Sequence, residues 1–380
     1  MNDRPEKISV SLAHDWLVGM RGGEWVLDRL ARLFGPTVLY TLVHDGRFHT
    51  QAIADCRIVT SPLQRCPGAK GRLRRAYLPF MPRAVECLKV DDCDLLISTS
   101  SAVMKSIRTS PSTRHMCYCH SPARYVWGQT EEYTQGAGGT LRGLGLRMIK
   151  NRFQNWDRET AVRVDCFLAN SSHTARRIRV CYERDAVVVH PPVRTEHFTH
   201  DETISREDWY LVVAALEPYK RTSLVIEAAN RKNLPLKVAG YGTQFRTLQA
   251  LAGPTVHMLG RVDEDELLAL YQRAKALVFP QLEDFGIVAA EAQATGCAVV
   301  AFGQGGALDI VTEETGVFFK EHSVDAILQA YSELAQRIAR NVVNPVMCRR
   351  NAERFSEKVF DEAIRREAAR VLAPDRDSGG

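Results

Sequence analysis

The sequence contains no long hydrophobic run. In its 380 residues, no uninterrupted apolar stretch approaches the roughly 20 residues that a membrane-spanning helix needs. The opening segment, MNDRPEKISV, also lacks the apolar core of a secretory signal peptide. Both absences predict a protein that stays in the cytoplasm.

CxxC pairs of cysteines are absent too. The ten cysteines include no CxxC pair, which argues against a disulfide scaffold and favours reduced, buried thiols. Cys117, Cys119 and His120, in the segment CYCH, resemble metal ligands only superficially, because no second cluster with a matching spacing exists. We therefore expect both cysteines to be strand residues rather than zinc ligands.

The net charge of +5 is unevenly distributed along the chain. Residues 1–190 contain 28 basic against 18 acidic residues, a net +10, so the remaining 22 basic and 27 acidic residues give −5. The basic residues of the first half are dispersed, and no nucleic-acid-binding motif accompanies them. This distribution favours phosphorylated ligands or an anionic membrane surface as partners over nucleic acid.

The chain is long for a single core, and one pattern occurs in it twice. Short apolar segments typical of strands alternate with segments typical of helices, and Pro191 and Pro192 mark the boundary between the two sets. The pattern predicts an α/β protein with two Rossmann-like, doubly wound domains, 1–192 and 193–355, whose strand ends face a cleft. The expected strands are 7–16, 37–43, 94–100, 115–121, 165–171 and 186–192, then 209–216, 235–242, 255–260, 276–280 and 298–302.

Two glutamates, Glu283 and Glu291, lie eight positions apart in PQLEDFGIVAAEAQATGCAVVAFGQGG (280–306). The residues around them read as the loop after strand 276–280 and then a helix that ends at Gly296. Glu283 is thus expected in the loop and Glu291 in the helix. Because units of this kind hold ligands at the carboxyl ends of their strands, both carboxylates are candidate binding groups.

The segment EDFGIVAAEA (283–292) resembles the E-x7-E motif of retaining GT-B glycosyltransferases of family four. The chain is particularly similar to the bacterial branch that builds O-antigen and exopolysaccharide chains, in which GDP-mannose is a common donor. In that fold the terminal helix, here 356–380, packs back on the first domain. Further matching segments are HDWLVGMRGGEWVLDRL (14–30), YCHSPARYVW (118–127), ANSSHTARRI (169–178), VVHPPVRTEHF (188–198) and EPYKR (217–221).

The resemblance implies a nucleotide-sugar donor site in the second domain. The family's second glutamate binds the ribose and its first lies against the donor sugar, roles that fall here on Glu291 and Glu283. Cations and backbone amides at a helix start stabilise the leaving diphosphate, so we expect no metal or other cofactor. The matching residues for the diphosphate are Lys220, Arg221, Phe285, Gly286 and Ile287.

In the first domain, the resemblance implies that His120 contacts the donor sugar, whereas the residues alone favour a structural histidine. Gly22 and Gly23 match a loop near phosphate and acceptor, with an ordinary turn before a helix as the alternative. Asp15, just after the first strand, is a candidate acceptor-binding residue, with helix capping or a turn as the alternative.

Two positions depart from the family pattern. Ala215 replaces an arginine that usually lies five positions before the lysine, which removes one cation from the diphosphate site. Asp309 stands where a glutamate is usual. The segment DDCD (91–94) contains DxD, the metal-binding signature of the other glycosyltransferase fold, but it precedes a strand, so we interpret Asp94 as a strand-entry residue.

The resemblance implies a retaining enzyme that moves a hexose, mannose from GDP-mannose first of all, onto a lipid-linked or saccharide acceptor in bacterial surface-polysaccharide synthesis. A nicotinamide dehydrogenase is also doubly wound, but GMRGGE (19–24) is not GxGxxG. A sugar-nucleotide epimerase or hydrolase of the same fold would turn over donor without an acceptor. A non-catalytic binding protein would bind the nucleotide sugar without transfer.

Two segments of the first domain alternate basic with apolar residues. This composition suits an amphipathic surface on an anionic bilayer, the alternative being a solvated face. We expect peripheral attachment to the cytoplasmic face of the inner membrane. The basic residues are Arg65, Lys70, Arg72, Arg74, Arg75 and Arg83 around YLPFMP (77–82), and Arg142, Arg147, Lys150 and Arg152 among Leu141, Leu144, Leu146 and Met148.

Overall fold

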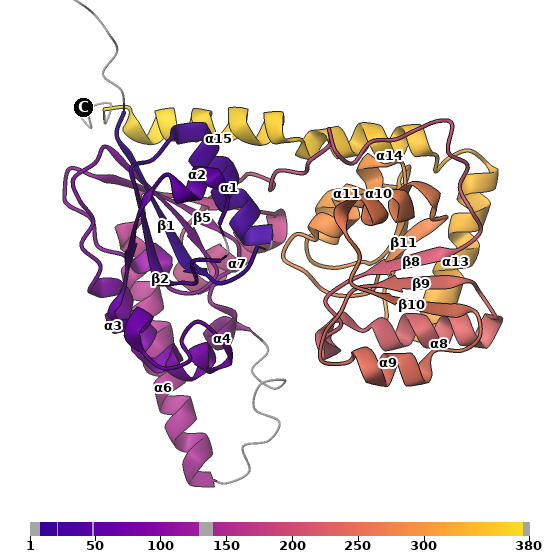
Figure 1. Cartoon of the computed structure of the whole chain (residues 1–380), viewed down its shortest axis with the longest axis horizontal. Coiled ribbons are helices and arrows are strands. Elements are labelled where there is room, and N and C mark those ends of the chain that lie inside the picture. The colour runs from indigo at the N-terminus through magenta and orange to yellow at the C-terminus, as the bar shows by residue number, and fades with distance from the viewer. Residues whose placement is uncertain (1–7, 21, 48, 129–139, 375–380) are drawn as a thin grey trace, which may run out of the picture. The chain divides into compact units, whose positions relative to one another are not determined.

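The computed structural model describes residues 8–20, 22–47, 49–128 and 140–374. It leaves the side chains of Arg72, Arg75 and residues 140–149 undescribed. The chain divides into two compact units, which are Met1–His190 with Asp361–Gly380 (unit 1) and Pro191–Phe360 (unit 2). Each unit is a parallel sheet with helices against it (Figure 1), which confirms the expected α/β class with two Rossmann-like domains.

The described part of unit 1 contains a seven-stranded parallel sheet in the order β3-β2-β1-β4-β5-β6-β7. The chain first runs outward from β1 to β3 and then crosses to β4 and runs outward in the other direction. The point where the strand order reverses therefore lies between β1 and β4, next to the carboxyl ends of both. The strands are β1 (Val10–Leu17), β2 (Val38–His44), β3 (Arg57–Thr60), β4 (Leu95–Ser100), β5 (Arg114–Cys119), β6 (Cys166–Ala169) and β7 (Ala186–Val188).

Helices cover the unit 1 sheet, and their ends follow ordinary capping rules. In α7, the Ser171 hydroxyl accepts the amide of Thr174 at 3.0 Å, and the helix ends at Glu183 in the left-handed region. The helices are α1 (Gly22–Phe34), α2 (Gln51–Ala54), α3 (Met81–Glu86), α4 (Arg124–Trp127), α6 (Thr140–Glu159) and α7 (Ser172–Tyr182), with 3-10 turns η1 (Pro62–Arg65), η2 (Arg72–Phe80), η3 (Met104–Ser106) and η4 (Thr160–Arg163).

The sheet described in unit 2 has six parallel strands in the order β10-β9-β8-β11-β12-β13. Its order reverses between β8 and β11, so the loops that follow these two strands start side by side. The strands are β8 (Tyr210–Val213), β9 (Leu236–Ala239), β10 (Val256–Gly260), β11 (Ala276–Phe279), β12 (Ala298–Phe302) and β13 (Gly316–Phe319).

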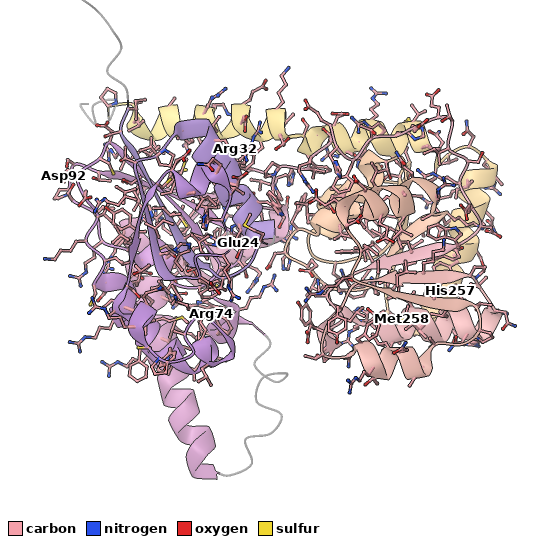
Figure 2. All side chains as sticks on the ribbon, in the orientation of Figure 1. Glu24, Arg32, Arg74, Asp92, His257 and Met258 are labelled. Atoms are coloured by element: carbon pink, nitrogen blue, oxygen red, sulfur yellow. The ribbon has the colours of Figure 1, made fainter. Side chains whose placement is uncertain are left out.

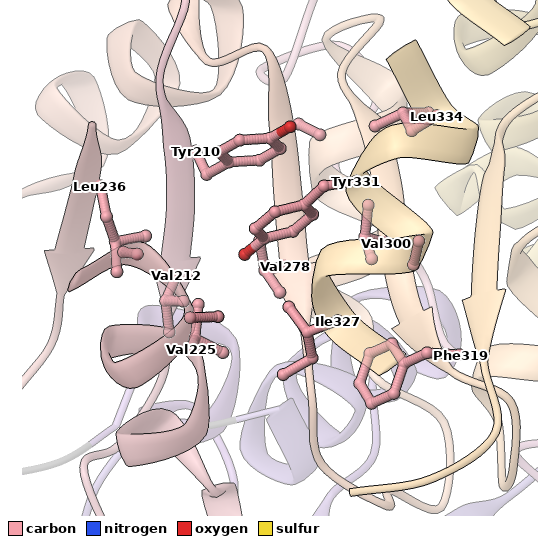
Figure 3. Packing of buried hydrophobic residues seen from close by; sticks show 14 of the residues in the cluster. Tyr210, Val212, Val225, Leu236, Val278, Val300, Phe319, Ile327, Tyr331 and Leu334 are labelled. Atoms are coloured by element: carbon pink, nitrogen blue, oxygen red, sulfur yellow. The ribbon is translucent and has the colours of Figure 1, made fainter. Parts of the chain in front are cut away.

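Helices bury both faces of the unit 2 sheet, and successive side chains along each strand point to opposite faces. Tyr210 and Val212 pack into a cluster with residues of α8, α9 and α13, whereas Leu211 packs with residues of α10, α11 and α14. In the first cluster the rings of Tyr210 and Tyr331 stack with centroids 4.0 Å apart (Figure 3). The helices are α8 (Thr222–Lys232), α9 (Phe245–Leu251), α10 (Glu264–Arg273), α11 (Ile287–Ala294), α12 (Ala307–Ile310), α13 (Val324–Ala339) and α14 (Pro345–Ala352), with η5 (Pro218–Lys220) and η6 (Glu353–Phe355).

The terminal helix α15 (Glu357–Leu372) contributes residues to both units, which meet in sequence at Phe360 and Asp361. Within unit 1, Ile364 is fully buried, and the Arg29 guanidinium donates two hydrogen bonds to Asp361, at 2.8 and 2.7 Å. None of the helices in the described ranges is long and apolar enough to cross a membrane.

Replacing Ile364 by Ala should lower the free energy of unfolding by about 2–5 kcal/mol, because a buried side chain leaves a cavity behind. Val359, on the same helix but 44% exposed, supplies the matched control, and its replacement by Ala should change stability by less than about 0.5 kcal/mol. Urea unfolding of both variants measures the difference. Equal effects would show that the second half of α15 does not pack as described.

Candidate functional site

A lysine and a glutamate meet where the strand order of unit 2 reverses. Lys220 ends η5 in the loop after β8, and Glu283 lies in the loop after β11. The Lys220 ammonium donates a hydrogen bond to the Glu283 carboxylate, and the two side chains are only 14% and 16% exposed. Two residues far apart in sequence thus form a partly buried ion pair at the position where α/β sheets commonly bind ligands.

Glycines shape the loop that carries Glu283. Gly286 has φ +101°, and a β-carbon there would lie 2.6 Å from the ring of Phe279. A β-carbon on Gly306 would lie 2.3 Å from the α-carbon of Phe285, and the Gly306 amide donates to the Glu283 carbonyl at 2.9 Å. The sequence reasoning missed Gly306, although the paired glycines of GQGG (303–306) were the available signal.

Helix α11 begins directly after this loop, with Gly286 as its N-cap. Phe285 is buried, with its ring edge-on to Phe355 at 5.5 Å, so its side chain belongs to the core. Its backbone, with those of Gly286 and Ile287, lies at the helix start, where amides lack partners within the helix and attract anions. The structure therefore places an anion-attracting helix start in the same short loop as Glu283.

Glu291 lies in the second turn of α11 and is partly buried. Its carboxylate accepts a hydrogen bond from the Tyr271 hydroxyl at 3.3 Å. Burial raises the pKa of Glu291 to about 7, against the opposing effects of the Arg194 charge and the Tyr271 hydrogen bond. Arg194 in turn donates two hydrogen bonds to Glu264, both at 2.9 Å. Near neutral pH, protonated and ionised Glu291 are therefore both populated.

The remaining unit 2 positions lie around the same loops. Arg221 is exposed, with φ 52°, at the start of α8. Ala215 is also exposed, and its carbonyl accepts the Glu217 amide at 2.8 Å, so its methyl group occupies a surface position. Asp309 lies in α12 and is partly exposed.

The carboxylate of Asp15 in unit 1 is held by the protein's own backbone. Its carboxylate is buried and accepts four backbone N–H groups from the turn after β4, at 2.6 to 2.9 Å. These contacts correspond to the turn alternative and use both oxygens of the carboxylate, while acceptor binding by Asp15 stays a prediction. The four donors are Ser101, Ala102, Val103 and Met104.

The structure brings Gly23 and His120 together. A β-carbon on Gly23 would lie 3.4 Å from His120 Nε2, so the imidazole lies against the start of α1, which Gly22 opens. The backbone of His120 is fixed on both sides, because its amide donates to Ser100 at 2.8 Å and its carbonyl accepts the Asn170 side chain at 2.9 Å. His120 thus sits at the carboxyl end of β5 in a defined position.

Two buried residues next to this point were not singled out from the sequence. His14 shares a hydrogen bond with Thr99 through Nδ1 at 2.6 Å. Its Nε2 lies 3.8 Å from a carboxylate oxygen of Glu24, which is labelled in Figure 2. Burial opposes the ionisation of Glu24, but the hydrogen bond and charge of His14 outweigh it and hold the pKa of Glu24 below its ordinary value. The signal was the run HDWLVGMRGGE (14–24), where a histidine and a glutamate flank the glycines.

The metal-like segment is part of the core. Cys117 and Cys119 are buried residues of β5, as expected, and burial raises the pKa of the Cys117 thiol to about 12. Across the described ranges, no group of three or more His, Cys, Asp or Glu side chains is arranged to hold a metal ion. Asp94 accepts the amide and hydroxyl of Ser9, both at 2.7 Å, at the entry to β4, which confirms its interpretation as a strand-entry residue.

The raised pKa of Glu291 predicts a pH-dependent stability. The folded chain holds this proton more tightly than the unfolded chain, so protonation of Glu291 stabilises the folded state. This contribution to the free energy of unfolding is complete below about pH 4.5 and is lost as the pH rises through about 7. Between pH 4.5 and 8, Glu291→Gln should therefore gain up to about 3 kcal/mol relative to the wild type. Urea unfolding across this range measures it, with the exposed Glu314→Gln as control. A pH-independent difference would contradict the assignment.

Two family models match the chain, one in each half. Residues 22–197 match "Glycosyltransferase Family 4", and residues 193–341 match "Glycosyl transferases group 1". A GDP-mannose-dependent monoacylated alpha-(1-6)-phosphatidylinositol monomannoside mannosyltransferase of Corynebacterium glutamicum is 28% identical over 50% of this chain and 58% of its own length. The D-rhamnosyltransferase WbpZ of Pseudomonas aeruginosa is 27% identical over 40% and 44%. The chain thus spans about half the length of these curated relatives.

Solved structures resemble the chain over nearly its whole length. Anabaena HepE in complex with UDP superposes with a TM-score of 0.72 at 14% identity, covering 96% of this chain and all of that one. Sucrose-phosphate synthase from Thermosynechococcus elongatus gives a TM-score of 0.69 at 15% identity, over 96% of this chain and 99% of its own. At these identities the likeness shows the fold. The chain therefore has the GT-B fold, and each of its two halves matches a glycosyltransferase family model.

Proposed function

We propose that the protein is a retaining glycosyltransferase that moves a hexose from a nucleotide sugar to a lipid-linked or saccharide acceptor in bacterial surface-polysaccharide synthesis. The proposed donor is GDP-mannose. The observation that carries the proposal is the Lys220–Glu283 pair beside the start of α11, where the strand order of unit 2 reverses. A cation, a carboxylate and a helix start in one place suit a diphosphate joined to a sugar.

Transfer of the sugar leaves negative charge on the departing diphosphate, and the site must stabilise this charge. Lys220 and the amides at the start of α11 supply fixed positive charge there, and the exposed Arg221 supplies a second cation in place of the one that Ala215 lacks. Glu283 accepts hydrogen bonds from the sugar, and Glu291 accepts them from the ribose. Because protein groups neutralise the diphosphate in this scheme, we propose a reaction that needs no divalent cation and tolerates chelators.

His120 is the proposed sugar contact of unit 1. It lies at the carboxyl end of β5 against Gly23, with its backbone held on both sides. Such fixed positioning is what an interaction with a transferred group requires, since stabilisation of the transition state depends on preorganised partners. Gly22 and Gly23 then present backbone to a phosphate or acceptor at the start of α1.

The names of the relatives support mannose as the first sugar to test. One relative is named as GDP-mannose-dependent and another as a D-rhamnosyltransferase. The solved structure with the TM-score of 0.72 is a complex with UDP. The base and the sugar of the donor are therefore to be decided by direct comparison of GDP-, UDP- and ADP-sugars.

The surface around η2 supports peripheral membrane attachment. Leu73 and Phe80 are 54% and 63% exposed, and Arg65, Lys70 and Arg83 in the same segment are exposed as well. Exposed apolar side chains among cations suit an anionic lipid surface, since each cation near the surface adds about 1 kcal/mol. We propose that unit 1 binds the cytoplasmic face of the inner membrane and the acceptor there.

Not every basic residue of the two predicted segments contributes to this surface. Arg74, which is labelled in Figure 2, places its guanidinium 4.9 Å from the centre of the Trp16 ring, so it stabilises η2 against β1. In the second segment, Arg152 is exposed on α6. Outside the described part of the chain lie the side chains of Leu141, Arg142, Leu144, Leu146, Arg147 and Met148. The proposal therefore rests on residues 65–83.

Donor binding is the first test of the proposed function. GDP-mannose at about 100 times its Kd should add about 2.7 kcal/mol to the stability of the wild type, seen as a raised Tm. Lys220→Ala should lose most of this shift, measured from its own ligand-free Tm, which should be lower because Glu283 loses the ion pair. The exposed Lys232→Ala, at the other end of α8, should keep the shift. Equal shifts in both variants would remove Lys220 from the donor site.

Transfer distinguishes the alternatives. GDP should be released from GDP-mannose only when a saccharide or lipid-linked acceptor is present. Turnover of UDP-GlcNAc without acceptor would instead favour the epimerase, and tight binding with no transfer to any acceptor would favour a binding protein.

Flotation with liposomes tests the membrane surface. The wild type should float with anionic vesicles at low salt, lose this binding as salt is added, and not bind neutral vesicles. The double variant Leu73→Ser, Phe80→Ser should bind clearly less, because the inserted apolar area is gone. Val180 and Val162, elsewhere on unit 1, are 74% and 76% exposed, and replacing both by Ser supplies the control. Equal binding of the two double variants would contradict this surface.

A further inference from the structure

The Lys220 ammonium is the counter-ion of Glu283 in the ligand-free chain. Both side chains are largely withdrawn from water, at 14% and 16% exposure. A carboxylate in such a place depends on its partner, because an unpaired buried charge is strongly unfavourable. The Lys220 ion pair therefore stabilises the ionised carboxylate of Glu283 before any ligand arrives.

The diphosphate of the proposed donor requires the same cation. When Lys220 turns to a phosphate oxygen, Glu283 loses its counter-ion and faces a second anion. A nucleotide sugar compensates for this loss, because its sugar hydroxyls donate hydrogen bonds to the carboxylate. A free nucleoside diphosphate has no such donors.

We propose that Glu283 lets the site discriminate between the nucleotide sugar and its nucleoside diphosphate product, by competing with the diphosphate for Lys220. This inference rests on the donor site proposed above. It gives Glu283 an effect on product release in addition to its contact with the transferred sugar.

The geometry makes lysine the partner that moves. The Glu283 carbonyl accepts the Gly306 amide at 2.9 Å, and a β-carbon on Gly305 would lie 2.4 Å from that carbonyl, so the backbone at Glu283 is closely packed. Lys220 has a long flexible stem, and its ammonium lies 5.3 Å from the centre of the Tyr219 ring. The ammonium can therefore change partners while the carboxylate stays in place.

Calorimetric titration of GDP, with UDP in parallel, tests the competition. Glu283→Gln keeps the shape of the side chain but removes its charge, so it should bind GDP about ten-fold more tightly than the wild type, a change of about 1.4 kcal/mol. The ratio of GDP-mannose affinity to GDP affinity should fall. In a Lys220→Gln background, Glu283→Gln should have little effect, because no ammonium is left to compete for.

Several outcomes overturn the inference. The first is a GDP affinity that is unchanged or weaker in Glu283→Gln. The second is an equal gain in GDP affinity with and without Lys220, which would indicate simple repulsion between the Glu283 carboxylate and the diphosphate. If the Gln variant unfolds, Glu283→Asp, which shortens the reach to Lys220, should show a smaller gain of the same sign. A wild type that binds neither GDP nor UDP overturns the proposed donor site itself, and this inference with it.

Discussion

Burial of both faces of two parallel sheets is the constraint on which the rest of this structure depends. Parallel strands need crossover helices, and those helices cover the sheet on both sides, so ligands have access only at the strand ends. In unit 2 the strand order reverses between β8 and β11, and the loops after these strands bring Lys220 to Glu283. The polar groups of the candidate site are thus a consequence of how an apolar sheet is buried.

The site also depends on residues that carry no functional group. Gly286 allows the loop after β11 to pass close to the Phe279 ring. Gly306 allows the loop after β12 to pass close to Phe285 in the loop after β11. Their missing side chains set the position of Glu283 and of the first amides of α11. The pKa of Glu291 is raised by burial, and Arg194 and the Tyr271 hydroxyl of α10 oppose this shift.

Strands in the centre of each sheet were predictable, because burial on both faces leaves a run of apolar residues such as ALVFP (276–280). The four-residue strands β3 and β13 were missed, since each lies at a sheet edge and its pairing, not its composition, makes it a strand. The E-x7-E spacing located the loop and helix of Glu283 and Glu291. The ion pair with Lys220 was beyond the sequence, because only the strand order brings the two loops together.

Asp15 gives the two units different sites despite their similar sheets. Its carboxylate ties the end of β1 to the turn after β4, so in unit 1 the place where the strand order reverses is filled by the protein's own backbone. The corresponding place in unit 2 is bridged by the ion pair between the Lys220 and Glu283 side chains. His120 lies one strand further along, directly after β5, and is not part of this turn. The place where the strand order reverses is thus closed by hydrogen bonds to backbone amides in unit 1 and by a side-chain ion pair in unit 2.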